Sequence, residues 1–269
     1  MLTRRKLLQG FAAGAASAAG LGALGDHTTD ALEVVRQNLP LERWDADGFV
    51  VALLTDTHVN LRTSVERARR ACRLAIAEKP DLIVLAGDYI TTSADWALTH
   101  IRDSLEPLAD APCPCVAVMG NHDYWTHEPR KILNALGRSP ARLLRNELLE
   151  VQGVQVAGID DALVNRHRPD VLAGKSLSKS LLAVLHEPDY VEEMPTHVSL
   201  QLSGHSHGGQ ICLPFGRPIH TPKGARRYVS GFYAQARVPL YVSRGVGTIG
   251  PNLRLFCRPE VSILTLRSA

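Results

Sequence analysis

Five short segments carry side chains that can bind a metal ion or transfer a proton, and each follows or ends an apolar run. They are Asp56-Thr57-His58, Gly87-Asp88, Gly120-Asn121-His122-Asp123, His186 and Gly204-His205-Ser206-His207. Residues at the carboxyl ends of strands in an open α/β sheet converge on one crevice, so these side chains can meet without being close in sequence. Carboxylates and imidazoles are costly to bury together, and divalent cations remove most of that cost. We therefore expect a metal site with oxygen and nitrogen ligands.

Each segment taken alone also has an ordinary structural explanation. Asp-x-His can be a helix cap beside a surface histidine, and Gly-Asp after a strand is often only a turn. His186 can be a loop histidine with its own hydrogen-bond partners. Gly-His-x-His is a stronger signal, because two imidazoles at alternate positions can face one metal cluster from a strand end. The order of the segments, each after its own strand, favours the metal site over the separate explanations.

The elements that must position these segments alternate between strand-like and helix-like patterns from about residue 48. Buried strands are expected where short apolar runs occur, at Phe49–Leu54, Leu82–Ala86 and Val116–Met119. Helices are expected between and after them, at Ser64–Glu78, Ser93–Leu108 and Pro129–Leu136. The later part predicts mainly strands, at Arg142–Leu144, Val154–Ile159, Leu181–Leu185, Val198–Leu202, Gln210–Leu213, Leu240–Ser243 and Val261–Leu266. The pattern predicts an α/β fold in which two packed sheets are flanked by helices.

The composition is that of a folded protein and excludes wholesale disorder. The chain has 269 residues, of which 45% are hydrophobic and 21% charged. Its net charge of +3 comes from Arg4, Arg5 and Lys6, because removing these from the 30 Lys+Arg leaves 27 against 27 Asp+Glu. A basic surplus confined to the N-terminus gives no reason to expect a nucleic-acid partner. The 5 cysteines are odd in number and lack metal-site spacing, so a disulfide scaffold is not expected.

The first 25 residues have the layout of an export signal. A basic stretch, Thr3–Gln9, precedes a weakly apolar stretch, Gly10–Gly25, that consists mostly of Ala, Gly and Leu. The pair Arg4-Arg5 resembles the twin-arginine type, whose export machinery carries folded proteins across the bacterial inner membrane. The alternative is a buried helix, which the five glycines of this stretch would weaken. We expect residues 1–25 to be such a signal or a membrane anchor, with the protein in the periplasm or on the outer face of the cytoplasmic membrane.

Residues 26–47 are expected to form a connecting arm, partly helical, before one domain that spans residues 48–269. The set Asp56/His58, Asp88, Asn121-His122, His186 and His205/His207 in this domain resembles the calcineurin-like metallophosphoesterase superfamily. Gly-His-Ser-His-Gly-Gly-Gln at 204–210, Tyr-Val-Ser-Arg-Gly-Val-Gly at 241–247 and the twin-arginine start resemble an exported bacterial branch of it. The resemblance implies a four-layer α/β/β/α sandwich with two mixed β-sheets.

The resemblance also implies the ligands of two divalent metal ions. One ion would be bound by Asp56, His58 and His207, the other by Asn121, His186 and His205, and both would be bridged by Asp88. Mixed nitrogen and oxygen ligation suits Mn, Fe or Zn better than Ca or Mg. The expected reaction is hydrolysis of a phosphate monoester or diester, with a hydroxide between two ions about 3.5–4 Å apart as the nucleophile.

His122 is the expected general acid for the leaving oxygen, because it follows the ligand Asn121 and is not itself in the ligand set. Asp123 can fix the tautomer of His122, or it can equally cap the turn that follows. On the substrate side, Arg226, Arg227 and Arg244 are expected to hold the phosphate. The alternative for each arginine is an ordinary solvated basic loop.

The sequence leaves other functions open. The same fold can serve as a non-catalytic metal-binding envelope protein, or as a diphosphatase that acts on a lipid-linked or nucleotide sugar. A mononuclear zinc hydrolase of another type is a further alternative. Thr91, three residues after Asp88, departs from the tyrosine ligand of purple acid phosphatases, and the Gly-Asp-x-Val-Asp-Arg-Gly motif of protein Ser/Thr phosphatases is absent.

Overall fold

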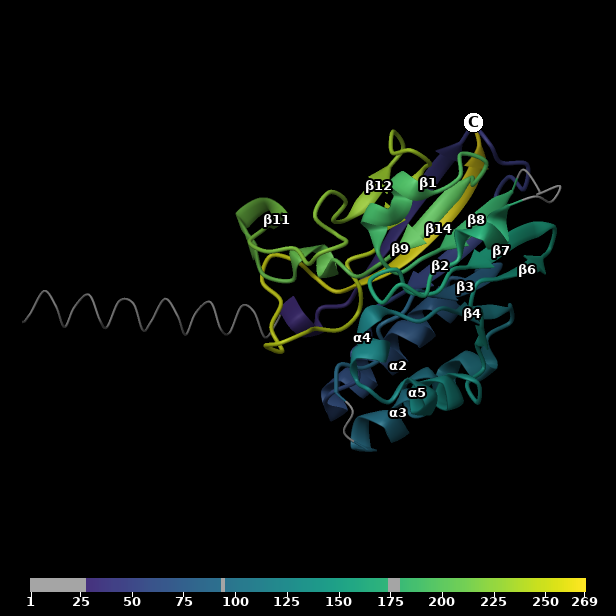
Figure 1. Ribbon diagram of the computed structural model, residues 1–269. Helices are drawn as coiled ribbons and strands as arrows, with labels where there is room; N and C mark the ends of the chain where they lie inside the picture. Colours follow the sequence, from purple (N-terminus) through teal and green to yellow (C-terminus); the bar gives the residue numbers. More distant parts are fainter. Residues whose placement is uncertain (1–27, 93–94, 174–179) are drawn as a thin grey trace, which may run out of the picture.

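The chain is described by a computed structural model that covers residues 28–92, 95–173 and 180–269. Two six-stranded β-sheets pack face to face, and helices cover the outer face of the first sheet (Figure 1). Side chains alternate along β2 (Val50–Leu54): Val51 and Leu53 lie between the two sheets, whereas Ala52 and Leu54 pack toward the helices. The predicted α/β fold with two mixed sheets is confirmed.

The first sheet has the strand order β1–β14–β2–β3–β4–β5. The strands other than β2 are β1 (Glu33–Leu41), β14 (Glu260–Ser268), β3 (Leu82–Leu85), β4 (Cys115–Ala117) and β5 (Arg142–Leu143). β2 to β5 run parallel to one another, β14 is antiparallel to β2, and β1 is parallel to β14. Because β2, β3 and β4 are parallel, the predicted ligand segments that follow them leave the sheet at the same edge.

The second sheet has the order β12–β13–β9–β8–β7–β6. Its strands are β12 (Gly231–Tyr233), β13 (Leu240–Val242), β9 (Leu200–Ser203), β8 (Leu181–Val184), β7 (Val154–Gly158) and β6 (Glu147–Val151). The four central strands are parallel, and the two edge strands are antiparallel to their neighbours. A small ribbon of β10 (Cys212–Leu213) and β11 (Arg217–Pro218) lies apart from both sheets.

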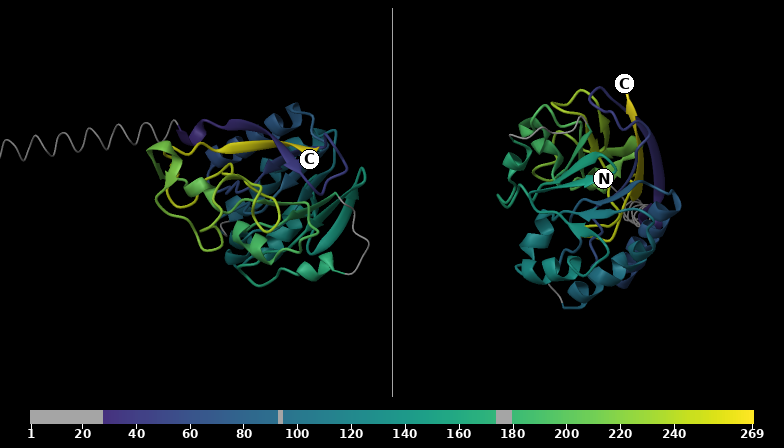
Figure 2. Two further views of the ribbon diagram at one scale, coloured as in Figure 1. Left: turned by 90° about the horizontal axis from the view of Figure 1, so that it is seen from above. Right: turned by 90° about the vertical axis from the view of Figure 1, so that its right-hand side faces the viewer.

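The outer layers differ between the two sheets. The first sheet is covered by α2 (Arg62–Ala77), α3 (Asp95–Leu105) and α5 (Pro129–Leu136), which lie together on one side in the right-hand view of Figure 2. A short helix, α4 (Asn121–Trp125), follows β4, and a 3₁₀ turn, η1 (Glu106–Asp110), follows α3. The remaining 3₁₀ turns are η2 (Pro169–Leu172), η3 (Pro188–Glu193), η4 (His207–Gly209) and η5 (Pro214–Gly216). Of these, η2 and η3 pack on the outer face of the second sheet.

The segment predicted as a partly helical connecting arm, residues 26–47, is helical at residues 28–30, but it also contributes a strand, β1, that was not predicted. Nine residues of β1 pair in parallel with β14, and Leu39 and Leu41 are buried between the sheets. Pro40 lacks a backbone N–H, and it is tolerated here because β1 is an edge strand with a neighbouring strand on one side only. The prediction failed here because the pairing partner, β14, lies more than 200 residues away in the chain.

The predicted export signal, residues 1–25, lies outside the described residues. Within the parts of the chain that the structure describes, no helix has both the length and the apolar character needed to cross a bilayer.

Leu144 supports the contact between the two sheets. It follows β5 in the first sheet, is fully buried, and lies so close to Gly158 of β7 that a Cβ at that glycine would meet the Leu144 Cβ at 2.2 Å. We expect Leu144→Ala to lower the free energy of unfolding by about 2–5 kcal/mol, because the shorter side chain leaves a cavity between the two sheets. Urea denaturation measures this loss. Leu61→Ala, at an exposed leucine, is the control and should change the value by less than about 0.5 kcal/mol.

Candidate metal centre

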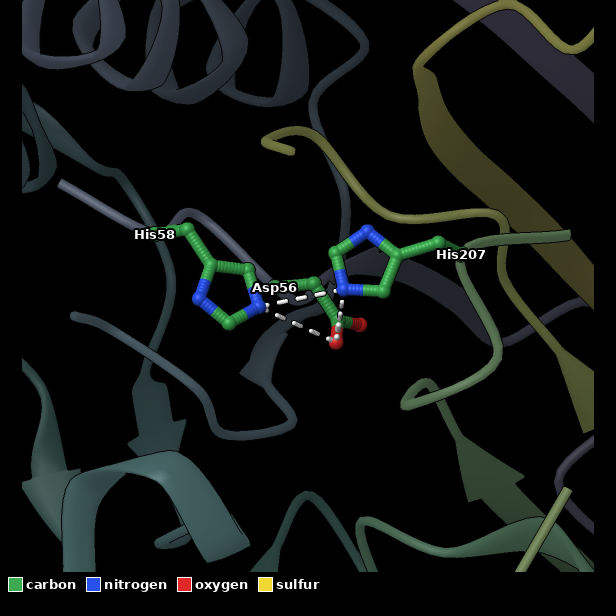
Figure 3. Close-up of side chains that lie close together, drawn as sticks. All are labelled: Asp56, His58 and His207. Carbon is green, nitrogen blue, oxygen red and sulfur yellow. Dashed lines mark hydrogen bonds and ion pairs between the residues drawn. The ribbon is translucent and has the colours of Figure 1, made fainter. Parts of the chain in front are cut away.

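Asp56, His58 and His207 form a first ligand group at the edge where the strands end (Figure 3). The two histidine Nε2 atoms lie 3.1 Å apart. Asp56 Oδ1 is 3.3 Å from His207 Nε2 and 3.9 Å from His58 Nε2. All three side chains are buried, and both rings turn a nitrogen toward the carboxylate of Asp56. Lone pairs that point at one another repel, and a cation between them turns this arrangement into a favourable one.

Asp88, His186 and His205 form a second group beside the first. Asp88 Oδ2 is 3.0 Å from His186 Nε2 in its own group and 3.6 Å from His58 Nε2 in the other group. One carboxylate therefore lies between the two groups, which is the position that a bridging ligand requires. The structure thus brings all six predicted carboxylate and imidazole ligands together in the two predicted sets.

Asn121, the seventh predicted ligand, is fully buried at the start of α4. Neither its Oδ1 nor its Nδ2 has a hydrogen-bond partner among the described residues, and the same holds for Asp56 Oδ1. A buried amide or carboxylate oxygen without a partner costs free energy. Cations in the two groups would satisfy both oxygens, so the residues present fit a pair of divalent metal ions.

The atoms that face away from the cluster are held by hydrogen bonds that orient the ligands. His58 Nδ1 lies 2.6 Å from Thr91 Oγ1, and His186 Nδ1 lies 2.6 Å from the carbonyl oxygen of Ala86. In a neutral imidazole, a ring nitrogen that donates to a carbonyl leaves the other nitrogen of the ring unprotonated. The neutral ring of His186 is therefore held with the lone pair of Nε2 available to bind a metal. His205 has the opposite arrangement, because its Nε2 lies 2.8 Å from the carbonyl oxygen of Lys223 and leaves Nδ1 for the metal.

Five of the ligands have a left-handed backbone. Their φ angles are +53° at Asp56, +42° at His58, +57° at Asp88, +67° at His205 and +52° at His207. This region is uncommon for residues other than glycine, and such strain persists only where the surroundings impose it. The chain reverses sharply at the end of each strand, so that the next side chain points into the shared cluster.

Burial keeps most of the imidazoles in the neutral form that binds metals. It lowers the pKa of His58 to about 3 and also lowers the pKa of His205 and of His207. Burial also raises the pKa of Asp56 to about 6. His186 differs: burial opposes its charged form, but the nearby carboxylates, Asp88 first, outweigh burial and raise its pKa. A proton on His186 thus compensates the buried carboxylates where no cation does so.

The chain matches the calcineurin-like phosphoesterase family over residues 49–209, a span that holds all seven predicted ligands. It belongs to this family. Phosphodiesterase YaeI of Escherichia coli is 32% identical over 273 residues, which cover 99% of this chain and 100% of the relative. The uncharacterized metallophosphoesterase YkuE of Bacillus subtilis is 32% identical over 285 residues, with 99% and 98% covered. The protein is therefore a metal-dependent phosphoesterase, a hydrolase of phosphoric esters.

One solved structure with a related chain path is a dimetal phosphatase from Danio rerio, with a TM-score of 0.47 and 13% identity. The match covers 74% of this chain and 88% of that chain.

A cavity of about 560 Å³ opens beside the ligands of this phosphoesterase. Asp88, Asn121, His205 and His207 contribute to its wall. His122 also lines it, and its ring lies 5.2 Å from the ring of His58 between centroids. The His122 backbone N–H donates to Asp88 Oδ1 at 2.9 Å, which ties the histidine to the carboxylate that lies between the two ligand groups. His122 is thus placed at the mouth of the metal centre without joining either ligand group.

Asp123 does not orient His122, so its predicted catalytic role is corrected. Its Oδ2 accepts from the backbone N–H of Asp88 at 3.0 Å and of Gly120 at 2.9 Å, and its Oδ1 accepts from Tyr89 at 2.8 Å. The carboxylate thus binds the turn after β3 and the residue before α4, whereas the alternative left open by the sequence was a cap on the turn that follows Asp123. Asp123 fastens the turn that carries Asp88 to the start of α4.

The three arginines predicted to hold the phosphate do not line the cavity. Arg244 donates to Glu260 at 2.5 Å and to Glu33 at 2.9 Å, so its charge is already paired. Arg226 and Arg227 are exposed, and their loop is held by backbone N–H groups that donate to Asp189. Their positions depend on acidic partners distant in sequence, which local patterns do not show. The cationic side chain that does line the cavity is Lys223.

Arg254 is a residue that sequence reasoning missed and that supports the backbone beside the ligands. It is fully buried and donates to the carbonyl oxygens of Gly247 at 2.7 Å, Arg244 at 2.7 Å and His207 at 3.2 Å. These contacts join the loop after β13 to the segment that carries His207. No sequence signal marks it, because it is a single arginine in an ordinary loop.

We expect Asp123→Ala to destabilise the metal-free protein by about 2–4 kcal/mol, because it removes the acceptor of four buried backbone N–H groups, those of Asp88, Tyr89, Ile90 and Gly120. Chemical denaturation in the presence of a chelator measures this loss. Asp110→Ala, at an exposed carboxylate, serves as the control. An unchanged free energy of unfolding combined with lost turnover would instead return Asp123 to the role of orienting His122.

Proposed function

We propose that this phosphoesterase is a dinuclear enzyme of the bacterial cell envelope that hydrolyses a phosphate diester or monoester. The observation that carries the proposal is the single carboxylate of Asp88, which lies within 3.0 Å of a histidine of one ligand group and 3.6 Å of a histidine of the other. Two divalent cations supply Lewis-acid charge for a phosphate ester and lower the pKa of a coordinated water.

The chain's own residues would divide the remaining work. Asp56, His58 and His207 would hold one cation, Asn121, His186 and His205 the other, and Asp88 both. His122 would hold a proton at the cavity wall for the departing alkoxide oxygen. Burial lowers its pKa, with Asp88 opposing the shift, so its protonated ring is a stronger acid than a free imidazolium. Lys223, which also lines the cavity, would attract the anionic ester.

Further arguments support the finer parts of the proposal. The name of the Escherichia coli relative, a phosphodiesterase, favours a diester substrate. The mixture of histidine nitrogens with carboxylate and amide oxygens favours Mn, Fe or Zn. The paired Arg4-Arg5 and the apolar stretch after it favour export by the twin-arginine route. Metal loading inside the cell, before export, is compatible with that route.

The proposal predicts close to two metal ions per chain in the purified full-length protein, with hydrolysis of bis-nitrophenyl phosphate. Asp88→Asn should lower the metal content below two and reduce kcat/KM by about 10²-fold or more, since one neutral amide cannot bridge two cations as a carboxylate does. Elemental analysis and a colorimetric assay measure both quantities. One ion per chain with full activity would sink the dinuclear proposal and favour a mononuclear hydrolase.

His122→Ala should keep the metal content and lose turnover by about 10²–10⁴-fold on esters with poor leaving groups. The loss should be much smaller for nitrophenyl esters, because a nitrophenolate leaves without being protonated. The measurement is kcat for paired alkyl and nitrophenyl esters at one metal concentration. An equal loss on both substrates would contradict the role as general acid.

A further inference from the structure

Four exposed apolar side chains gather on the loops next to the cavity. Phe215 has its whole side chain in solvent at 105% relative exposure, Ile219 is 63% exposed, Leu213 is 49% exposed, and Phe256 is also exposed. We call these four residues the apolar rim. A group of large exposed apolar side chains often marks an interaction surface, whereas single exposed apolar side chains are common and need no explanation.

Backbone pairing holds the rim together. Leu213 of β10 pairs with Arg217 of β11, and Ile219 N–H donates to the carbonyl oxygen of Ile211 at 3.3 Å. On the other side, Cys212 N–H donates to Leu255 at 2.9 Å, which places Phe256 next to β10. Phe215 has a φ of +68°, an unfavourable conformation for an aromatic residue that keeps its ring at the tip of the ribbon. The rim is therefore a built surface and not a set of isolated side chains.

The rim continues into the cavity of the metal centre. Ile219 belongs to both, and beyond it the cavity wall is largely apolar, with Trp125, Leu163, Ile211, Pro222 and Ile249. The polar groups of the wall come from the metal ligands and from His122, Ser206, Gln210, His220 and Lys223. A site of 560 Å³ built in this way offers room for much more than a phosphate, and the additional part of the ligand must be apolar to match its wall.

The segment of sequence that carries the rim is free of acidic residues. Residues 194–259 contain no Asp or Glu and eight basic residues: Arg217, Lys223, Arg226, Arg227, Arg237, Arg244, Arg254 and Arg258. Arg217 and Arg258, adjacent to the rim, are exposed, as is Lys223 at the cavity. Apolar side chains that project beyond a basic surface are the arrangement that binds anionic lipid bilayers.

The described chain also begins next to this surface. Thr29 accepts from the backbone N–H of Arg254 at 2.7 Å, and Arg254 stands two residues before Phe256 in the sequence. The sequence that precedes it includes the apolar stretch Gly10–Gly25. A membrane segment attached at this point would hold the rim and the cavity mouth close to the same bilayer.

We propose that the apolar rim docks on an anionic lipid surface, and that the cavity takes the apolar part of a phosphate ester presented by that surface. This inference rests on the proposed function for the chemistry at the phosphate. Its own content is the docking and the apolar substituent of the substrate. A second copy of this chain is the main other occupant that the rim could bind.

Tryptophan fluorescence tests the docking directly in the full-length protein. Phe215→Trp should show a blue shift with vesicles of phosphatidylglycerol and phosphatidylcholine, and quenching by brominated lipid chains. The signal is read as the difference from the parent protein, which has 3 tryptophans. Arg102→Trp, on α3 at the outer face of the first sheet, is the control and should show neither effect.

Equal quenching at both positions, or none at position 215, would overturn the docking even if the protein binds vesicles through its N-terminal residues. A blue shift without lipid that depends on protein concentration would assign the rim to contact between two copies.

A series of nitrophenyl phosphodiesters with alkyl groups from methyl to octyl tests the apolar pocket. The parent kcat/KM should rise with chain length, by up to about fourfold per buried methylene. Ile219→Ser should flatten this dependence, whereas Leu61→Ser, at an exposed leucine that does not line the cavity, should retain it.

Hydrolysis of the methyl ester without any rise with chain length would overturn the inference and leave the proposed function standing. Failure to hydrolyse any ester with Mn²⁺ or Zn²⁺ would contradict the proposed function, and the quenching experiment would still decide the docking.

Discussion

The structure depends on one constraint: polar metal ligands from strands of both sheets are withdrawn from water at the same edge. Together they hold two carboxylates, four imidazoles and an amide, and partners within the described chain do not satisfy all of them. Such a cluster is costly to bury, and cations reduce that cost. The metal centre is thus part of what holds the two sheets in register at this edge, because each ligand group draws on both sheets. Asp56 follows a strand of the first sheet and His207 a strand of the second.

The same constraint explains the local strain around the centre. Parallel strands deliver their ends to one edge, but a side chain that simply continued the strand would point along the sheet and away from the cluster. Left-handed backbone at Asp56, Asp88 and His207 redirects these side chains toward one another. Hydrogen bonds stabilise these unfavourable backbone conformations. The Asp123 carboxylate accepts from the backbone N–H of Asp88, and Arg254 donates to the carbonyl oxygen of His207.

The parts of the site that follow from local pattern could be predicted, and those that follow from distant pairing could not. Short apolar runs marked β2, β3, β4, β8 and β9, and each was followed by ligands, so the seven ligand positions could be predicted without knowing how the sheets pack. β1 lacked this mark, since its burial comes from pairing with β14 across most of the chain. The predicted phosphate-binding role of Arg244 was wrong for the same reason. Its guanidinium forms ion pairs with Glu33 and Glu260, and neither glutamate is a neighbour of Arg244 in the sequence. Asp123 remained ambiguous because an aspartate can either cap a turn or fix the tautomer of a histidine that acts as a general acid.

The segment after β9 links the two halves of the proposed chemistry. His205 and His207 enter the metal cluster, and only a few residues later the same chain forms β10, β11 and the exposed Phe215. Gly208 and Gly209 permit this change of direction, because a Cβ at Gly208 would meet Arg244 at 2.6 Å and one at Gly209 would meet Pro218 at 2.4 Å. Close packing at these two glycines leaves little slack between the ligand loop and the rim. The rim is therefore placed at a fixed distance from the backbone that positions His207, whereas the ligands of the first sheet lie on separate segments of the chain.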